Sequence, residues 1–162
     1  PRRRIVPVFH HRPDSCNKHN LRNTRKGSRS YGQTYSRNLR TELRHNRKVY
    51  FYDNGIRNAI ISNFAPVNLR TDIGALWENM MLSERVKHNA YCQSYAKIYF
   101  WRTQAQQEID FVEIEDGMMQ AYEFKFNPKK MPRVPKAFSE TYPEALFHVV
   151  TPENYTSFVG VM

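Results

Sequence analysis

Hydrophobic and polar positions follow a helical period in one long segment, residues 72–89. Its apolar residues recur at intervals of three and four positions: Ile73, Leu76, Trp77, Met80 and Met81. That spacing places all of them on one face of an α-helix. Thr71 or Asp72 precedes the segment and is a suitable N-cap. The pattern therefore predicts an amphipathic helix whose apolar stripe faces the core.

Shorter segments predict the other elements. Aromatic and β-branched residues favour strands in "KVYFYD", "KIYFWRT" and "ALFHVVT", which span residues 48–53, 97–103 and 145–151. Short helices are predicted within residues 54–64, 132–143 and 152–159. From residue 72 onward the order is helix, three strands, helix, strand. This order predicts an α/β (α+β) fold, with three antiparallel strands, one further strand after a helical crossover, and helices flanking the mixed sheet.

Residues 107–127, "QEIDFVEIEDGMMQAYEFKFN", read as a hairpin around Asp116-Gly117, a pair that favours a type I′ turn. This turn would place Asp110 opposite Glu123, with Lys125 on the same face. The other face would be apolar and comprise Ile109, Phe111, Tyr122, Phe124 and Phe126. Opposed carboxylates repel unless a proton or a cation lies between them. Because Mg²⁺ prefers oxygen ligands, the hairpin predicts a metal site.

The same charges allow a simpler interpretation. Glu123 and Lys125 would then form an ion pair with Glu108 on an edge strand that faces water. Glu78, beside Trp77 on the predicted helix, would be an ordinary surface residue. In the metal interpretation, Glu78 instead supplies a third carboxylate to the site.

The net charge of +10 belongs to the front of the chain. Residues 1–50 carry 14 Lys and Arg against two acidic residues, whereas residues 51–162 carry 11 against 13. Residues 1–35 show no helical or strand period. We therefore divide the chain into a basic, poorly patterned segment, residues 1–45, and a domain, residues 46–162. The basic segment suits either contact with a phosphate backbone or a solvated tail.

Two cysteines give no disulfide framework, which fits a reducing cytoplasm. No apolar run is long enough for a membrane span, and no signal peptide is visible. A front cluster could suggest zinc, but its spacing matches no standard finger: His10, His11, Cys16 and His19. Because the first residue is Pro1 rather than Met, we expect a fragment or a processed chain.

Four stretches together resemble a known family: "SRNLRTELRHNRKVYFYDNGIRNAI", "GALWENMMLSERVKHN", "FWRTQAQQEIDFVE" and "AYEFKFN". A helical Glu, then an Asp, then Glu-x-Lys on adjacent strands is similar to the PD-(D/E)XK nuclease superfamily. Within it, the chain resembles the C-terminal domain of unknown function of bacterial AAA-type ATPases, from about Ser36 to Phe158. The resemblance implies a restriction-endonuclease-like fold.

The resemblance also implies roles for four residues. Glu78 would be the helix carboxylate, Asp110 the central metal ligand and Glu123 the second ligand. Lys125 would position or activate the attacking water. The cofactor would be Mg²⁺ or Mn²⁺, and the activity that of a DNA endonuclease or related phosphodiesterase.

Two features depart from the family pattern. The sequence contains no G-x-x-x-x-G-K-[ST] motif, so no ATPase activity is expected from this chain alone. Only the last wing of the family's winged-helix segment, roughly Ser36–Asp53, is recognisable. Two alternatives to a nuclease therefore stay open: an inactive module that binds DNA or a protein partner for an ATPase, and a remnant that lacks its ATPase domain.

Overall fold

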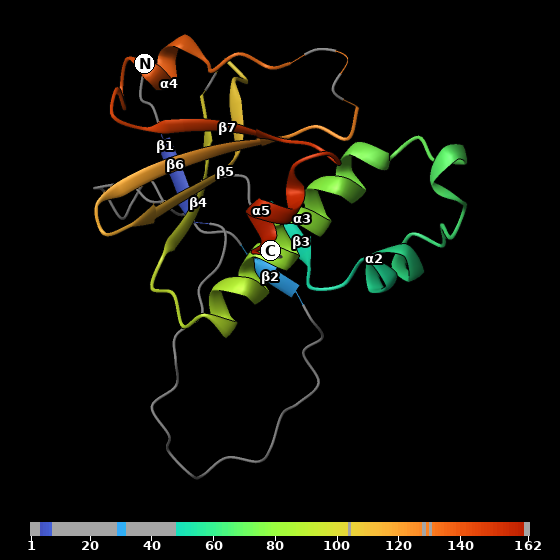
Figure 1. Ribbon diagram of the computed structural model, residues 1–162. Coiled ribbons are helices and arrows are strands. Elements are labelled where there is room, and N and C mark those ends of the chain that lie inside the picture. Colours follow the sequence, from blue (N-terminus) through green and yellow to red (C-terminus); the bar gives the residue numbers. More distant parts are fainter. Residues whose placement is uncertain are drawn as a thin grey trace, which may run out of the picture.

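A five-stranded mixed sheet with helices on both faces forms the centre of the protein in this computed structural model (Figure 1). The structure describes residues 4–7, 29–31, 48–103, 105–127, 129 and 131–160. The strands, in sheet order, are β1 Arg4–Pro7, β4 Lys97–Arg102, β5 Glu108–Glu115, β6 Met118–Phe124 and β7 Leu146–Val150. Neighbouring strands are antiparallel except β6 and β7, which are parallel. The predicted α/β fold, three antiparallel strands plus one after a helical crossover, is confirmed.

The helices cover the sheet unequally. They are α2 Asn54–Ile60, α3 Ile73–Tyr91, α4 Lys136–Ser139 and α5 Tyr155–Val159, with a 3₁₀ turn, η1, at Val67–Leu69. α3 and α5 lie on one face of the sheet, α4 lies on the other, and α2 stands beyond α3 (Figure 1). A separate pair of strands, β2 Arg29–Tyr31 and β3 Val49–Phe51, packs beside α3. None of the described helices is both long and apolar enough to cross a bilayer.

β1 and β2 lie in the front segment, where the pattern predicted no strand. Each is only three or four residues long and pairs with a strand distant in sequence. A period cannot be recognised in so short a run, so only the partner strand reveals the element. The rejected zinc cluster at residues 10–19 and most of the wing at residues 36–53 lie outside the described residues.

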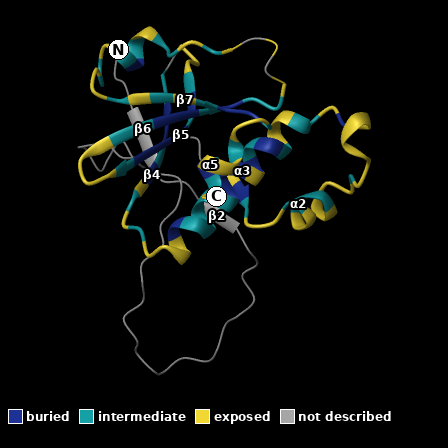
Figure 2. Cartoon of the chain, in the orientation of Figure 1, coloured by how far each residue is buried: buried dark blue, intermediate teal, exposed yellow. Residues whose placement is uncertain are grey.

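Two apolar clusters fill the two faces of the sheet. The α3-side cluster comprises Tyr50, Trp77, Met81, Leu82, Ile98, Phe100, Phe111, Tyr122, Phe124, Val150 and Phe158. The α4-side cluster comprises Trp101, Ile109, Val112, Ala121 and Phe138. β5 and β6 carry buried residues toward α3, while the hairpin tip is exposed (Figure 2). The central strands therefore bury apolar residues on both faces.

The hairpin has the predicted turn and register. Asp116 and Gly117 both have positive φ, 49° and 82°, as a type I′ turn demands. Glu115 pairs with Met118, and the ladder continues regularly to Phe111 and Tyr122. β6 is an interior strand between β5 and β7, so an edge-strand position for Glu123 and Lys125 is excluded.

A β-bulge in β5 corrects the predicted faces. Tyr99 of β4 pairs with Val112, but Trp101, only two residues later, pairs with Ile109. One extra residue is therefore inserted in β5, so that two residues oppose one on the partner strand. Beyond the bulge the parity of β5 is reversed. Ile109 accordingly belongs to the α4-side cluster and Phe111 to the α3-side cluster, although the sequence predicted both on one face.

The buried face of α3 is rotated about the helix axis relative to the predicted apolar face. Trp77 and Met81 are buried as predicted, but Met80 is 37% exposed and Leu82 is fully buried. Ser83 is also buried, because β3 and the sheet contact adjacent sides of the helix. Asp72 is the N-cap, yet its side chain does not bond to the helix and binds two arginines instead.

Candidate metal centre

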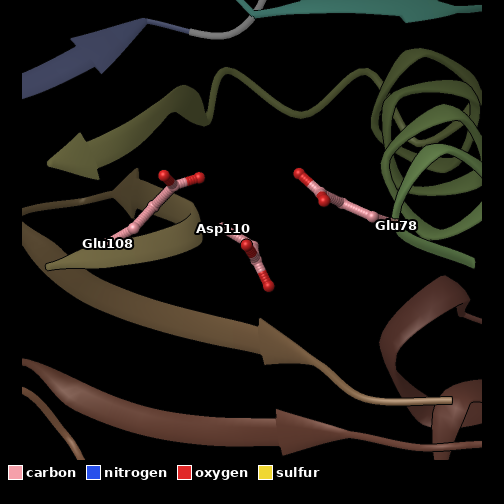
Figure 3. Close-up of side chains that lie close together, drawn as sticks. All are labelled: Glu78, Glu108 and Asp110. Carbon is pink, nitrogen blue, oxygen red and sulfur yellow. The ribbon is translucent and has the colours of Figure 1, made fainter. Parts of the chain in front are cut away.

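Three carboxylates from α3 and β5 converge on the α3 side of the sheet. Oxygens of Glu78, Glu108 and Asp110 all lie within 4.8 Å of one another. Glu78 extends from α3, while Glu108 and Asp110 extend toward it from β5 (Figure 3). All three are only partly accessible, with 24%, 26% and 14% of the side chain exposed. The side chains thus form a small, half-buried anionic site.

The β5 bulge explains how Asp110 reaches this site. In a regular strand Asp110 would share a face with Val112, which packs on the α4 side. The bulge between Ile109 and Val112 turns Asp110 to the α3 side, together with Phe111. Glu108, two residues earlier, lies on the same side as Asp110. A local irregularity in β5 therefore assembles the carboxylates.

Asp110 is the most perturbed acid in the site. One of its carboxylate oxygens accepts a hydrogen bond of 3.0 Å from the Phe124 amide of β6. Burial, Glu78 and Glu123 raise the pKa of Asp110 to about 7, although the Phe124 amide and Lys48 act in the opposite direction. Near neutral pH this acid is therefore about half protonated even with Lys48 beside it, and a further positive charge would favour its anion.

Lys48, just before β3, supplies a positive charge at the centre of the three acids. Its Nζ lies 3.1 Å from Glu78 and 3.9 Å from Asp110, and it forms a close ion pair with Glu108. The Tyr50 hydroxyl donates to the same Glu78 oxygen at 2.6 Å. Burial of its ring and the Glu78 charge raise the pKa of Tyr50, so it stays a donor.

Asn79 holds β3 in position against α3. Its side chain accepts from the Phe51 amide at 2.7 Å and donates to the Phe51 carbonyl at 2.9 Å. It also donates to Asn54 at the start of α2. Asn79 is 3% exposed, so these bonds replace those with water. This clamp places Lys48 and Tyr50 beside Glu78, its neighbour on the helix.

Glu123 and Lys125 lie at the edge of the site. Glu123 is not among the three converging acids, and its carboxylate accepts from Lys125 at 2.7 Å. Glu123 lies between Tyr122 and Phe124 of the α3-side cluster along β6, and its charge contributes to the raised pKa of Asp110. The pairs observed between β5 and β6 end at Phe111 and Tyr122, so the predicted position of Glu123 opposite Asp110 stays a prediction.

Lys125 nevertheless belongs electrostatically to the site. Its burial would lower the pKa of its ammonium, but the bond to Glu123 and the charges of Asp110 and Glu78 outweigh that effect and raise it. Lys125 is therefore a permanent cation beside the carboxylates near neutral pH.

Glu108 is the site residue that the sequence interpretation assigned elsewhere. It was placed only in the alternative ion pair with Lys125, whereas its partners here are Lys48 and Arg102. Its position two residues before Asp110 was the available signal, because such residues share a strand face.

The three carboxylates fit a hard divalent cation. Mg²⁺ binds oxygen at about 2.1 Å, so opposite ligands are about 4.2 Å apart, and Ca²⁺ sites are somewhat wider. A separation within 4.8 Å therefore requires only small side-chain adjustments. A hollow of about 280 Å³ beside β3 and α3 reaches Lys48 and Glu78. A larger hollow of about 410 Å³ lies at the other end of α3, around Arg85 and Glu115, away from these acids.

Comparison with known proteins places the chain in one family. Searches among curated proteins and among solved structures found no match. A protein-family model, described as "Domain of unknown function (DUF4143)", matches residues 73–159. This range covers more than half of the chain and contains α3, the β4–β7 strands and all three converging acids. The chain therefore belongs to this family of domains of unknown function.

Proposed function

We propose that this domain is a metal-dependent phosphodiesterase of the nuclease type, acting on DNA. The observation that carries the proposal is the convergence of Glu78, Glu108 and Asp110 within 4.8 Å, with a lysine, Lys125, whose pKa is raised in part by the charges of Asp110 and Glu78. Carboxylates that accommodate a divalent cation next to a lysine suit the stabilisation of a pentacovalent phosphorane or a similar anionic transition state.

The three converging acids would hold Mg²⁺ or Mn²⁺. Such an ion, when bound, supplies a Lewis acid for a phosphoryl oxygen and lowers the pKa of bound water. Asp110 is oriented for ligation by the Phe124 amide, which holds one of its oxygens at 3.0 Å. Glu78 is oriented by the Tyr50 hydroxyl. Hydrogen bonds of this kind fix the direction of a ligand and increase its affinity for the metal.

Lys125 would stabilise the charge that develops on the phosphoryl group or position the attacking water. Glu123 holds its ammonium at 2.7 Å, so Glu123 acts on the reaction through Lys125. The expected role of Glu123 as a direct metal ligand stays a prediction, since reaching the cation requires its side chain to leave Lys125.

The wider context of the proposal is a bacterial AAA-type ATPase. The resemblance of the chain to the C-terminal domains of those ATPases supports a nuclease-like module that works for an ATP-driven partner. The net charge of the front 50 residues, 14 basic against two acidic, supports contact of that segment with a phosphate backbone.

A second candidate function, a binding module without cleavage, is favoured by Lys48. Its ammonium contacts all three acids and already neutralises part of their charge. Because Lys48 reduces the repulsion between the three acids, their arrangement can be stable without a metal. The domain would then recognise DNA or a protein partner through its surface alone.

Cleavage of DNA separates the two candidates. Purified protein is incubated with supercoiled, linear and single-stranded DNA in Mg²⁺ or Mn²⁺, and products are resolved on gels. We expect cleavage that EDTA abolishes, and at least a hundredfold loss in Lys125→Ala, as for removal of one transition-state donor. Lys97→Ala, an exposed lysine at the start of β4, is the matched control and should cut normally.

Two results would decide against the phosphodiesterase. Activity that survives in Asp110→Asn would come from another site or a contaminant. DNA binding by the wild type without cleavage of any substrate, in either metal, would favour the binding module.

A further inference from the structure

We infer that Lys48 is a built-in counter-ion of the carboxylate site and that a divalent cation must displace it to bind. The inference rests on the proposed metal site and adds a residue that controls access to it. It starts from one observation: a single ammonium group contacts all three acids that would hold the metal.

Geometry makes the two cations mutually exclusive. The Lys48 Nζ lies 3.1 Å from Glu78, 3.9 Å from Asp110 and closer still to Glu108. A metal ligated by the same oxygens would lie about 2.1 Å from each of them. Two positive charges would then share a volume only a few ångströms across. Their repulsion in a half-buried site is large, so one of them has to leave.

Lys48 can leave without disturbing the core. Its side chain is 24% exposed, and it stands just before β3, not inside the sheet. The clamp that Asn79 makes is to the backbone of Phe51, three residues further on. Rotation of the lysine side chain toward the adjacent hollow therefore leaves β3 and Tyr50 in place.

The consequence is a site whose charge is partly neutralised when it is empty and which releases the lysine ammonium when a metal binds. Without Lys48, three carboxylates would repel one another in the metal-free protein. With Lys48, the metal-free fold is stabilised and the apparent affinity for metal is reduced, because binding includes the loss of the lysine contacts.

Titration with Mn²⁺ tests this inference, with the free ion measured by its electron paramagnetic resonance signal. We expect Lys48→Met to bind Mn²⁺ at least roughly tenfold more tightly than the wild type, because a cation within about 4 Å of the metal is removed. Lys48→Arg, which keeps the charge, should bind like the wild type. Lys97→Met, the same change at an exposed position, is the control for lost surface charge and should also match the wild type.

The outcomes separate this inference from the proposed function. If wild type binds Mn²⁺ through Asp110 but Lys48→Met binds no more tightly, Lys48 does not compete and only the inference falls. If Lys48→Met alone binds Mn²⁺, the inference holds and the wild-type domain by itself is not the active metalloenzyme. If neither binds in an Asp110-dependent manner, both are overturned. Should Lys48→Met unfold, Lys48→Gln, which keeps a polar group, provides the same comparison.

Discussion

Two groups of charged side chains join α3 to β5, and they differ in how completely their charges are balanced. At one end of the interface, Glu113 is 2% exposed and is bound by Arg85, through two nitrogens, and by Asn89. At the other end, Glu78, Glu108 and Asp110 share the single ammonium of Lys48. The interface of α3 and β5 thus contains one carboxylate whose charge and hydrogen bonds are fully matched, and one group in which three carboxylates share a single cation.

The difference supports a structural role for the first group and the proposed metal-binding role for the second. A buried charge that serves only the fold needs a partner and hydrogen bonds for every oxygen, and Glu113 has them. Acids that bind a cation are expected to lack full charge compensation in its absence, and Asp110 has a pKa of about 7 because burial and its acidic neighbours outweigh Lys48. The following predictions break or sharpen this contrast.

Breaking the balanced group should have the largest effect on stability. Arg85→Met leaves the Glu113 carboxylate buried without its charge partner, which should reduce the free energy of unfolding by about 3–5 kcal/mol. Urea unfolding measures the loss. The double variant Arg85→Met/Glu113→Gln should recover part of it, because no buried charge then remains. A loss in Arg85→Met below about 1 kcal/mol would show that this pair is not structurally important.

The unbalanced group should make the metal-free protein less stable as pH rises. The pKa of Asp110 is raised in the fold, so the folded state holds its proton more tightly than the unfolded state. This contribution is fully present below about pH 4 and is lost as pH rises through about 7. It is at most about 4 kcal/mol for a shift of about three pH units. Urea unfolding in EDTA between pH 4 and 8 should show it.

Asp110→Asn is the control for that slope, since it keeps the shape of the side chain and removes the titrating proton. The variant should lose the Asp110 part of the pH dependence and, at pH 8 without metal, be no less stable than the wild type. Identical slopes in the two proteins would mean that the Asp110 pKa is not raised in the fold.

A divalent cation should stabilise the unbalanced group alone. A metal that binds only the folded state adds about 2.7 kcal/mol at one hundred times its Kd. Thermal unfolding in millimolar Mg²⁺ or Mn²⁺ should therefore show a higher Tm for the wild type and for Arg85→Met, but not for Asp110→Asn. An equal rise in all three proteins would place the metal elsewhere.

The sequence predicts the hairpin well because its information is local. Asp116-Gly117 specifies the turn, and the turn specifies the pairing of Glu115 with Met118. The helix α3 was also predicted, since its apolar spacing is strong, but the exposure of Met80 depends on which side of the helix β3 covers. Short strands that pair with distant partners, β1 and β2, lack a period that can be recognised.

The candidate site was predicted only in part, for a related reason. Glu78 and Asp110 were identified as site residues and do lie together. The neighbours of Asp110 were predicted on the assumption that β5 is a regular strand without a bulge. The bulge in β5 is visible only in the pairing with β4, a separate strand, and it moves Asp110 to the α3 side. Lys48 precedes β3 and lies far from Glu108 and Asp110 in sequence. No pattern within one segment could reveal either feature.

The position of a bound metal tests the central claim most directly. Crystals grown with Mn²⁺ can be measured near the manganese absorption edge, where anomalous scattering locates the ion. The account predicts a peak about 2.1–2.3 Å from oxygens of Glu78, Glu108 and Asp110, with the Lys48 ammonium moved out of the site. Crystals in which this position holds no manganese and Lys48 still contacts all three acids, at Mn²⁺ concentrations well above those that support cleavage or stabilisation, would contradict it.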